Sequence, residues 1–215
     1  MNKLLRDTQG GALVEFTLVF PVFILVALGT VDFTFLLFDR SMAAKAAYQG
    51  ARTAIVTSPV ASNITNLTYD PLQIGQWCFD PGTGGPSPTA NCPSASSVCT
   101  PNSASSGSCT NSQGTFDNTA FTTILNSMQA VFPRVQRQNV QISYQTTGLG
   151  FAGRPAGLPM DVTVSITCMN HQFYFIGALM GFAFPALPAG CPAANPGPII
   201  PPFSTTLPSE DMVTN

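Results

Sequence analysis

The sequence predicts an α+β fold with one long N-terminal helix that spans a membrane, a second helix and a small antiparallel sheet. The first observation is a stretch without charge from Phe16 to Val31, followed by an Ala-rich sequence. The second is a stripe of large apolar side chains at helical spacing within residues 118–132. The third is a set of short C-terminal segments that alternate apolar and polar residues, as half-buried strands do.

Composition narrows the classes of function. Charged residues make up 8% of the 215 residues and the formal net charge is -2, whereas about 25% of an average soluble domain is charged. The chain therefore lacks the basic surface that nucleic-acid binding requires. It has a single histidine, His171, and no nucleophile–base pair, phosphate loop or metal-ligand spacing, so we expect no enzyme, cofactor or metal.

The first apolar segment is long enough to cross a bilayer. As a helix, Ala12–Phe38 would extend about 40 Å, against a hydrocarbon core of about 30 Å. Lys3 and Arg6 precede it, which favours a cytoplasmic N-terminus by the positive-inside rule. The opposing signal is a set of basic residues beyond the span: Arg40, Lys45 and Arg52.

Two other interpretations of this segment stay open. A secretory signal peptide would explain the basic start, and the small residues Ala43, Ala44, Ala46 and Ala47 resemble its cleavage site. The apolar stretch exceeds the usual length of about 7–15 residues, and a removed peptide gives no reason for Glu15. A plain membrane anchor is the second alternative.

The helix continues beyond the membrane. The sequence "SMAAKAAYQGARTAIV" after Arg40 is rich in Ala, the strongest helix former, so we expect helix to about Val56 and a stop at Pro59. The whole element would be about 65 Å long. Pro21 removes one backbone donor, and we expect a kink there.

Three sequence blocks in the first 56 residues form a specific set. "GGALVEFTLVFP" fits a G-x-x-x-V-E-F-A-L-V-x-P start, "GTVDF" fits G-x-x-D-F, and "AAYQGAR" fits A-A-x-x-G-A-R. In these blocks the chain resembles the TadE-like family, although Thr17 stands where the family usually has Ala. The matching residues are Gly10, Val14, Glu15, Phe16, Leu18, Val19, Pro21, Gly29, Asp32, Phe33, Ala46, Ala47, Gly50, Ala51 and Arg52. The remainder matches only in outline.

The resemblance implies a minor pilin or pseudopilin of a Tad-type (type IVc) pilus and secretion system, with a type IV pilin-like exterior domain. "GGALVEF" fits the Tad/Flp processing pattern of Gly, four residues, Glu and an aromatic. A cut after Gly10 by a prepilin peptidase would make Gly11 the first residue and Glu15 the fifth, with Phe16 next. The implied roles are pilus assembly, adhesion or biofilm formation. The alternative is a membrane-anchored envelope or adhesion protein with a disulfide-stabilised exterior domain that never enters a pilus.

The resemblance also implies partners, location and domain bounds. The partners are the prepilin peptidase, major and minor pilins, the inner-membrane assembly platform and the lipid bilayer, and no nucleic acid. The protein would cross the bacterial inner membrane once, with a cytoplasmic N-terminus and a periplasmic C-terminal domain, or be incorporated into a surface pilus. Residues 1–10 are then a leader peptide, 11–57 the long helix (spanning to about 38), 58–117 a loop and 118–215 the exterior domain.

Four residues of the long helix have physical roles to weigh. The Glu15 carboxylate would cost roughly 2.5–3.5 kcal/mol in mid-membrane, so we expect it to pair with a neighbouring subunit's new α-amine, or else to reach water at the interface. Gly29 permits close helix approach. Asp32 is expected to mark the outer interface rather than to carry protons. Arg52 would pair with an acidic neighbour or phosphate headgroups, or be a solvated helix charge.

The exterior segments follow from composition and periodicity. Residues 58–117 are rich in Gly, Ser and Pro and predict an extended loop restrained by disulfides. An even number of cysteines beyond an apolar N-terminal segment favours an oxidising compartment. Fifteen pairings are possible. Sequence proximity favours Cys99–Cys109 and Cys168–Cys191, which leaves Cys78–Cys92.

The C-terminal part supplies the second helix and the sheet. We expect a helix from about Asn118 to Phe132, capped by Asp117 or Asn118. "NVQISYQ" and "MDVTVSITC" predict strands joined by a hairpin-like loop, and "FSTTLPSED" resembles the last strand of the family's domain. The apolar residues 173–187 are too few for a span. We expect them to contact the membrane surface or another pilin, with a re-entrant segment as the alternative.

Overall fold

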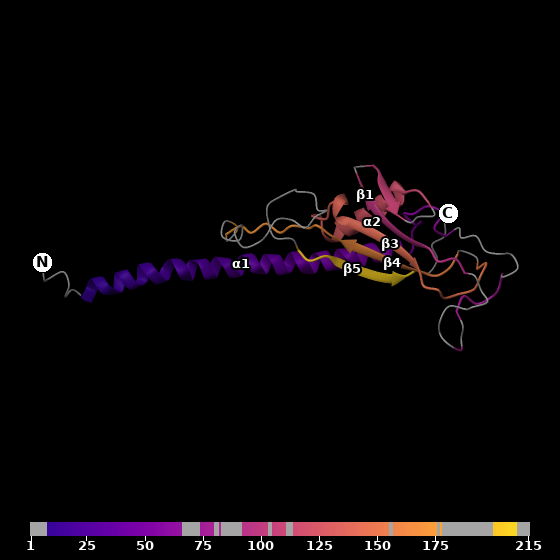
Figure 1. Cartoon of the computed structure of the whole chain (residues 1–215). Helices are drawn as coiled ribbons and strands as arrows, with labels where there is room; N and C mark the ends of the chain where they lie inside the picture. The colour runs from indigo at the N-terminus through magenta and orange to yellow at the C-terminus, as the bar shows by residue number, and fades with distance from the viewer. Residues whose placement is uncertain are drawn as a thin grey trace. The chain divides into compact units, whose positions relative to one another are not determined.

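The computed structural model describes residues 8–65, 74–79, 82, 92–102, 105–110, 114–154, 157–175, 177 and 200–209. Within them the fold is α+β, as predicted, with a long helix, a second helix and one antiparallel sheet (Figure 1). The elements are α1 (Thr8–Ala54), β1 (Ser96–Pro101), β2 (Gly107–Thr110), α2 (Asn118–Val131), the 3-10 turn η2 (Arg137–Asn139), β3 (Val140–Thr146), β4 (Met160–Ile166) and β5 (Phe203–Pro208).

The chain divides into two compact units, and the boundary falls within α1. The first unit comprises Met1–Arg40 and Asn170–Ile199, and the second comprises Ser41–Met169 and Ile200–Asn215. The domain bounds expected from the sequence stay a prediction.

In the first unit, α1 presents an almost continuous apolar surface. Large apolar side chains from Leu13 to Phe38 are exposed, and the helix is long and apolar enough to cross a membrane. Water is a poor solvent for such a surface, whereas lipid is not. The helix continues through Pro21, so this proline does not end it. The expected kink stays a prediction.

In the second unit, the sheet has the order β2-β1-β3-β4-β5 and every neighbouring pair is antiparallel. The β3–β4 hairpin is in the predicted place, with Val140 opposite Ile166 and Thr146 opposite Met160. The alternating apolar residues of both strands are buried, since successive side chains point to opposite faces. They are Val140, Ile142, Tyr144, Val162, Val164 and Ile166.

The core forms where α1 and α2 meet this sheet. The C-terminal part of α1 buries a stripe of small residues: Ala43, Ala46, Ala47, Gly50, Ala51 and Ala54. A Cβ added at Gly50 would lie 2.7 Å from the Met128 side chain of α2 and 3.3 Å from Val164 of β4. Small residues on α1 therefore allow close contact with both neighbouring elements.

The second helix begins and ends as the sequence predicts. The Asp117 carboxylate caps it by accepting hydrogen bonds from the backbone N–H groups of Thr119 (2.7 Å) and Ala120 (3.1 Å). The helix ends before Pro133, which cannot continue it. Its predicted apolar stripe is buried, including Phe121, Leu125 and Met128.

The extended-loop prediction for residues 58–117 is wrong at β1 and β2. Both strands form there, and β1 pairs with β3 so that Cys99 lies opposite Ile142. The inward-facing residues of β1 are Ser97 and Cys99, both buried. Because these side chains are small and not aliphatic, the alternation of β1 carries little hydrophobic signal.

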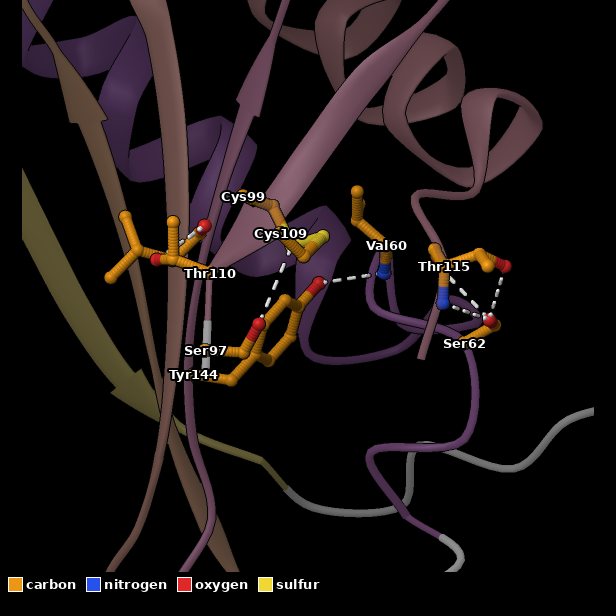
Figure 2. Close-up of a disulfide and its surroundings, with 9 residues drawn as sticks. Val60, Ser62, Ser97, Cys99, Cys109, Thr110, Thr115 and Tyr144 are labelled. Atoms are coloured by element: carbon orange, nitrogen blue, oxygen red, sulfur yellow. Dashed lines mark hydrogen bonds between the residues drawn. A yellow bond between two sulfur atoms is a disulfide. The ribbon is translucent and has the colours of Figure 1, made fainter. Parts of the chain in front are cut away.

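A buried tyrosine joins the segment after α1 to the sheet. The hydroxyl of Tyr144, on β3, accepts a hydrogen bond of 2.9 Å from the backbone N–H of Val60 (Figure 2). Both residues are buried, and burial raises the pKa of Tyr144 well above its ordinary value. The protonated phenol is therefore the form that the fold accommodates.

Candidate membrane-contact and assembly site

The predicted processing residues lie at the start of α1. Gly10 and Gly11 are within the helix, and a Cβ added at Gly11 would meet nothing within 4 Å. Glu15 and Phe16 are exposed, and the Phe16 ring stacks on Phe20 with ring centroids 5.1 Å apart. Within the described part of the chain no hydrogen bond reaches the Glu15 side chain, so its carboxylate faces outward from the helix.

Asp32 is buried although its neighbours in sequence are exposed. Its Oδ1 accepts a hydrogen bond of 3.2 Å from the backbone N–H of Tyr174, and its Oδ2 accepts one of 2.8 Å from that of Phe175. Hydrogen bonds to an ionised carboxylate are among the stronger ones in proteins. Asp32 therefore binds a second segment of the chain, a contact that the sequence alone does not predict.

Asp39 makes a second contact one heptad further along α1. Its Oδ2 lies 2.8 Å from Nδ1 of His171. Both side chains are buried, and Nε2 of His171 has no hydrogen-bond partner among the described residues. Residues seven apart share a helix face, so Asp32 and Asp39 present their carboxylates along one stripe.

We call Asp32, Asp39 and residues 171–175 the clasp. His171 meets Asp39, while Tyr174 and Phe175 meet Asp32, so residues 171–175 run antiparallel to α1. Seven residues of helix rise about 10 Å, and three to four extended residues cover a similar length. The segment thus lies extended along the helix.

Aromatic side chains line the same contact. The ring centroids of Phe33 and Phe173 are 6.2 Å apart, and those of Phe35 and Tyr174 are 6.1 Å apart. Such tilted and edge-on pairs are favourable beyond the area they bury. The clasp therefore combines polar anchors at two points with aromatic contacts between them.

The other predicted helix residues are dispersed. Pro21 is exposed and Gly29 is half-buried in the first unit. Arg52, in the second unit, is exposed, and its guanidinium carbon lies 6.0 Å from the centroid of the Tyr48 ring. The structure does not bring these residues together with Glu15.

The two disulfides for which both cysteines are described lie in the second unit. Two predicted pairs are present, Cys78–Cys92 and Cys99–Cys109. The second joins directly opposite residues of β1 and β2. Cys168 is also disulfide-bonded, and Cys191, its predicted partner, lies outside the described residues. Among the described residues no group of three or more His, Cys, Asp or Glu could hold a metal ion.

Residues 10–52 match the family model of TadE-like protein. Over these residues the chain is similar to the TadE-like family. The TadE-like segment contains Glu15, Asp32, Asp39 and Arg52, and the match supports a Tad/Flp pilus-associated protein in general. The family is structural and non-enzymatic. No curated protein and no solved structure matches the chain.

A sequence signal for the clasp exists in retrospect. Two acidic residues seven apart on an apolar helix require polar partners on one face. The only histidine of the chain is followed by the aromatic-rich "QFYF". The backbone donors of residues 174 and 175 leave no residue-specific signal, so Asp32 could not be assigned to them from sequence.

Proposed function

We propose that this protein is a minor pilin or pseudopilin of a Tad-type pilus and secretion system. The observation that carries the proposal is the TadE-like helix itself, apolar and exposed, with Glu15 facing outward near its start. An exposed apolar helix suits both a bilayer and a bundle of similar helices. The protein would contribute to pilus assembly, adhesion or biofilm formation.

Processing by a prepilin peptidase is the first step of this function. Cleavage after Gly10 leaves Gly11 with an α-amine whose pKa is about 8, so it is positive at neutral pH. In a bundle of subunits, this amine neutralises the Glu15 carboxylate of a neighbour. The pair offsets the cost of a charge in lipid, roughly 2.5–3.5 kcal/mol in mid-membrane, and fixes the axial register.

Intact-mass measurement of the membrane-purified protein tests processing. The expected mass is that of a chain beginning at Gly11, and a Gly10→Leu variant supplies the uncleaved reference. A wild-type mass that still includes Met1–Gly10 would show that the proposed cut does not occur.

Substitution of Glu15 tests assembly in the native host. Glu15→Ala removes the carboxylate, and we expect loss of piliation with the protein still present in the membrane. Glu15→Asp is the matched control, because it keeps the charge and should assemble better than the Ala variant. Wild-type piliation in Glu15→Ala would refute the assembly role and favour an envelope or adhesion protein outside the pilus.

The proposed topology places the N-terminus in the cytoplasm and the second unit in the periplasm. The disulfides support this side, since they persist in oxidising compartments. The inner-membrane assembly platform and other pilins are the proposed partners. Reporter fusions after Thr57 and at the C-terminus should both be active only as periplasmic reporters, and cytoplasmic activity would contradict the orientation.

A further inference from the structure

We propose that the clasp seats Tyr174 and Phe175 in the outer interface of the bilayer, giving the protein a second lipid contact beside the apolar span. The inference rests on the proposed span and adds to it a specific segment, depth and set of anchors. The occupant of this aromatic surface is lipid, at the level where acyl chains meet headgroups.

The depth follows from the length of α1. Leu13–Val31 rises about 28 Å as a helix, which matches the hydrocarbon core of about 30 Å. Asp32 to Asp39 then covers about 10 Å more. A bilayer is about 40–45 Å thick with its headgroup regions, so the clasp coincides with the interfacial layer on one side.

The side chains suit that layer. Tyr174 is 70% exposed and Phe175 is 53% exposed, and the partly exposed rings of Phe33 and Phe35 lie beside the segment. Tyrosine is enriched at membrane interfaces because its ring is apolar and its hydroxyl is polar. Exposed rings in water would be unfavourable, whereas the interface accommodates them.

The direction of residues 171–175 along α1 also supports an interfacial position. Residues 171–175 run toward the N-terminal, apolar part of α1, so the segment approaches the hydrocarbon core as it leaves His171. The sequence from Phe173 to Leu187 has no charged residue. Because Asp32 and Asp39 are buried and hydrogen-bonded, neither carboxylate meets lipid without a partner.

Depth-dependent fluorescence quenching tests the proposal on the full chain. The single tryptophan, Trp77, is replaced by Phe, and Tyr174→Trp places a probe in the clasp. The protein is reconstituted at high lipid-to-protein ratio in phosphatidylcholine–phosphatidylglycerol vesicles brominated near the headgroup or near the chain end. We expect the probe at 174 to be quenched at least twofold more by shallow than by deep bromines.

Two further variants separate the clasp from the span. Phe20→Trp in the same background reports the span and should be quenched most by deep bromines. Asp32→Leu removes both acceptors for residues 174 and 175, and we expect lipid quenching of the probe at 174 to fall at least twofold while acrylamide quenching rises. Thr34→Leu is the matched control, since Thr34 is exposed and its hydroxyl donates to the carbonyl of Thr30 in its own helix.

The outcomes are distinct. If Phe20→Trp is quenched by lipid and the probe at 174 is quenched only by acrylamide, the span stands and the inference is wrong. A probe at 174 shielded from both quenchers indicates a protein neighbour and also overturns it. Equal lipid quenching of the probe at 174 with and without Asp32→Leu would show that the Asp32 carboxylate does not hold this segment at the interface. Failure of both probes to reach lipid would refute the span itself.

Discussion

Substitution of Gly50 measures how closely α1 packs against α2 and the sheet. In Gly50→Ala the new Cβ would lie 2.7 Å from Cγ and Sδ of Met128 and 3.3 Å from Val164. Met128 is fully buried and cannot swing into solvent. Overpacking of a core costs about 1–3 kcal/mol, whereas replacing Gly by Ala within a helix gains about 1 kcal/mol. The two effects oppose, so the single variant should be neutral to about 2 kcal/mol less stable.

The sign of the stability change caused by Gly50→Ala becomes diagnostic once the Met128 side chain is shortened. Met128→Ala alone should cost about 2–5 kcal/mol through the cavity that it leaves. In that background the methyl group introduced by Gly50→Ala enters the vacated space, so this second substitution should raise stability by about 1 kcal/mol. The coupling free energy between the two substitutions should therefore be about 1–3 kcal/mol, in the range expected for residues in direct contact.

Thermal unfolding of the four proteins in mild detergent, followed by near-ultraviolet circular dichroism or calorimetry, gives this coupling. For a domain of this size, about 1 kcal/mol corresponds to a few degrees in Tm. The reasoning fails if Gly50→Ala changes stability equally in both backgrounds, within about 0.5 kcal/mol. Such additivity would mean that Met128 does not limit the space at Gly50.

Three further features of the second unit can be tested by substitution. Tyr144→Phe leaves the buried N–H of Val60 without its acceptor and should lower the free energy of unfolding in urea by about 1–3 kcal/mol. Because burial raises the pKa of Tyr144 above its ordinary value of about 10, the stability of the wild-type protein should also decline as pH rises above that value. An equal decline at alkaline pH in the Phe variant would exclude this tyrosine as its source. Asp117→Ala should cost about 1 kcal/mol and Asp117→Asn far less, since Asn also caps helices; equal losses would point to charge rather than capping. Joint replacement of Cys99 and Cys109 by Ala should lower the free energy of unfolding by about 2–4 kcal/mol, and an unchanged midpoint would show that the hairpin needs no cross-link.

The elements that could be predicted from sequence are those with strong hydrophobic periodicity. The apolar run of α1, the stripe of α2 and the alternation in β3 and β4 each correspond to an element in the structure. β1 was missed because its inward positions are Ser97 and Cys99, and its order depends on pairing with β3. Local composition cannot report a strand that is stabilised by a distant neighbour.

The candidate site was predictable in one part only. Glu15 was identified because its position relative to Gly10 forms a local motif. The clasp joins residues far apart in the chain, since Asp39 and His171 are 132 positions apart. Its other half uses backbone N–H groups, which every residue except proline carries. A single sequence therefore indicated that Asp32 needed explanation without indicating its partner.

The three acidic residues of the apolar helix differ in how their charge is accommodated. Asp32 and Asp39 are buried and satisfied within the first unit by residues 171–175. Glu15 is exposed and receives no hydrogen bond from the described residues. A carboxylate in lipid is costly without a partner. Asp32 and Asp39 have partners within the same chain, whereas Glu15 has none among the described residues. That asymmetry is what an intermolecular role for Glu15 requires. It also makes the two features separable: Glu15→Ala should abolish assembly without altering lipid contact at Tyr174.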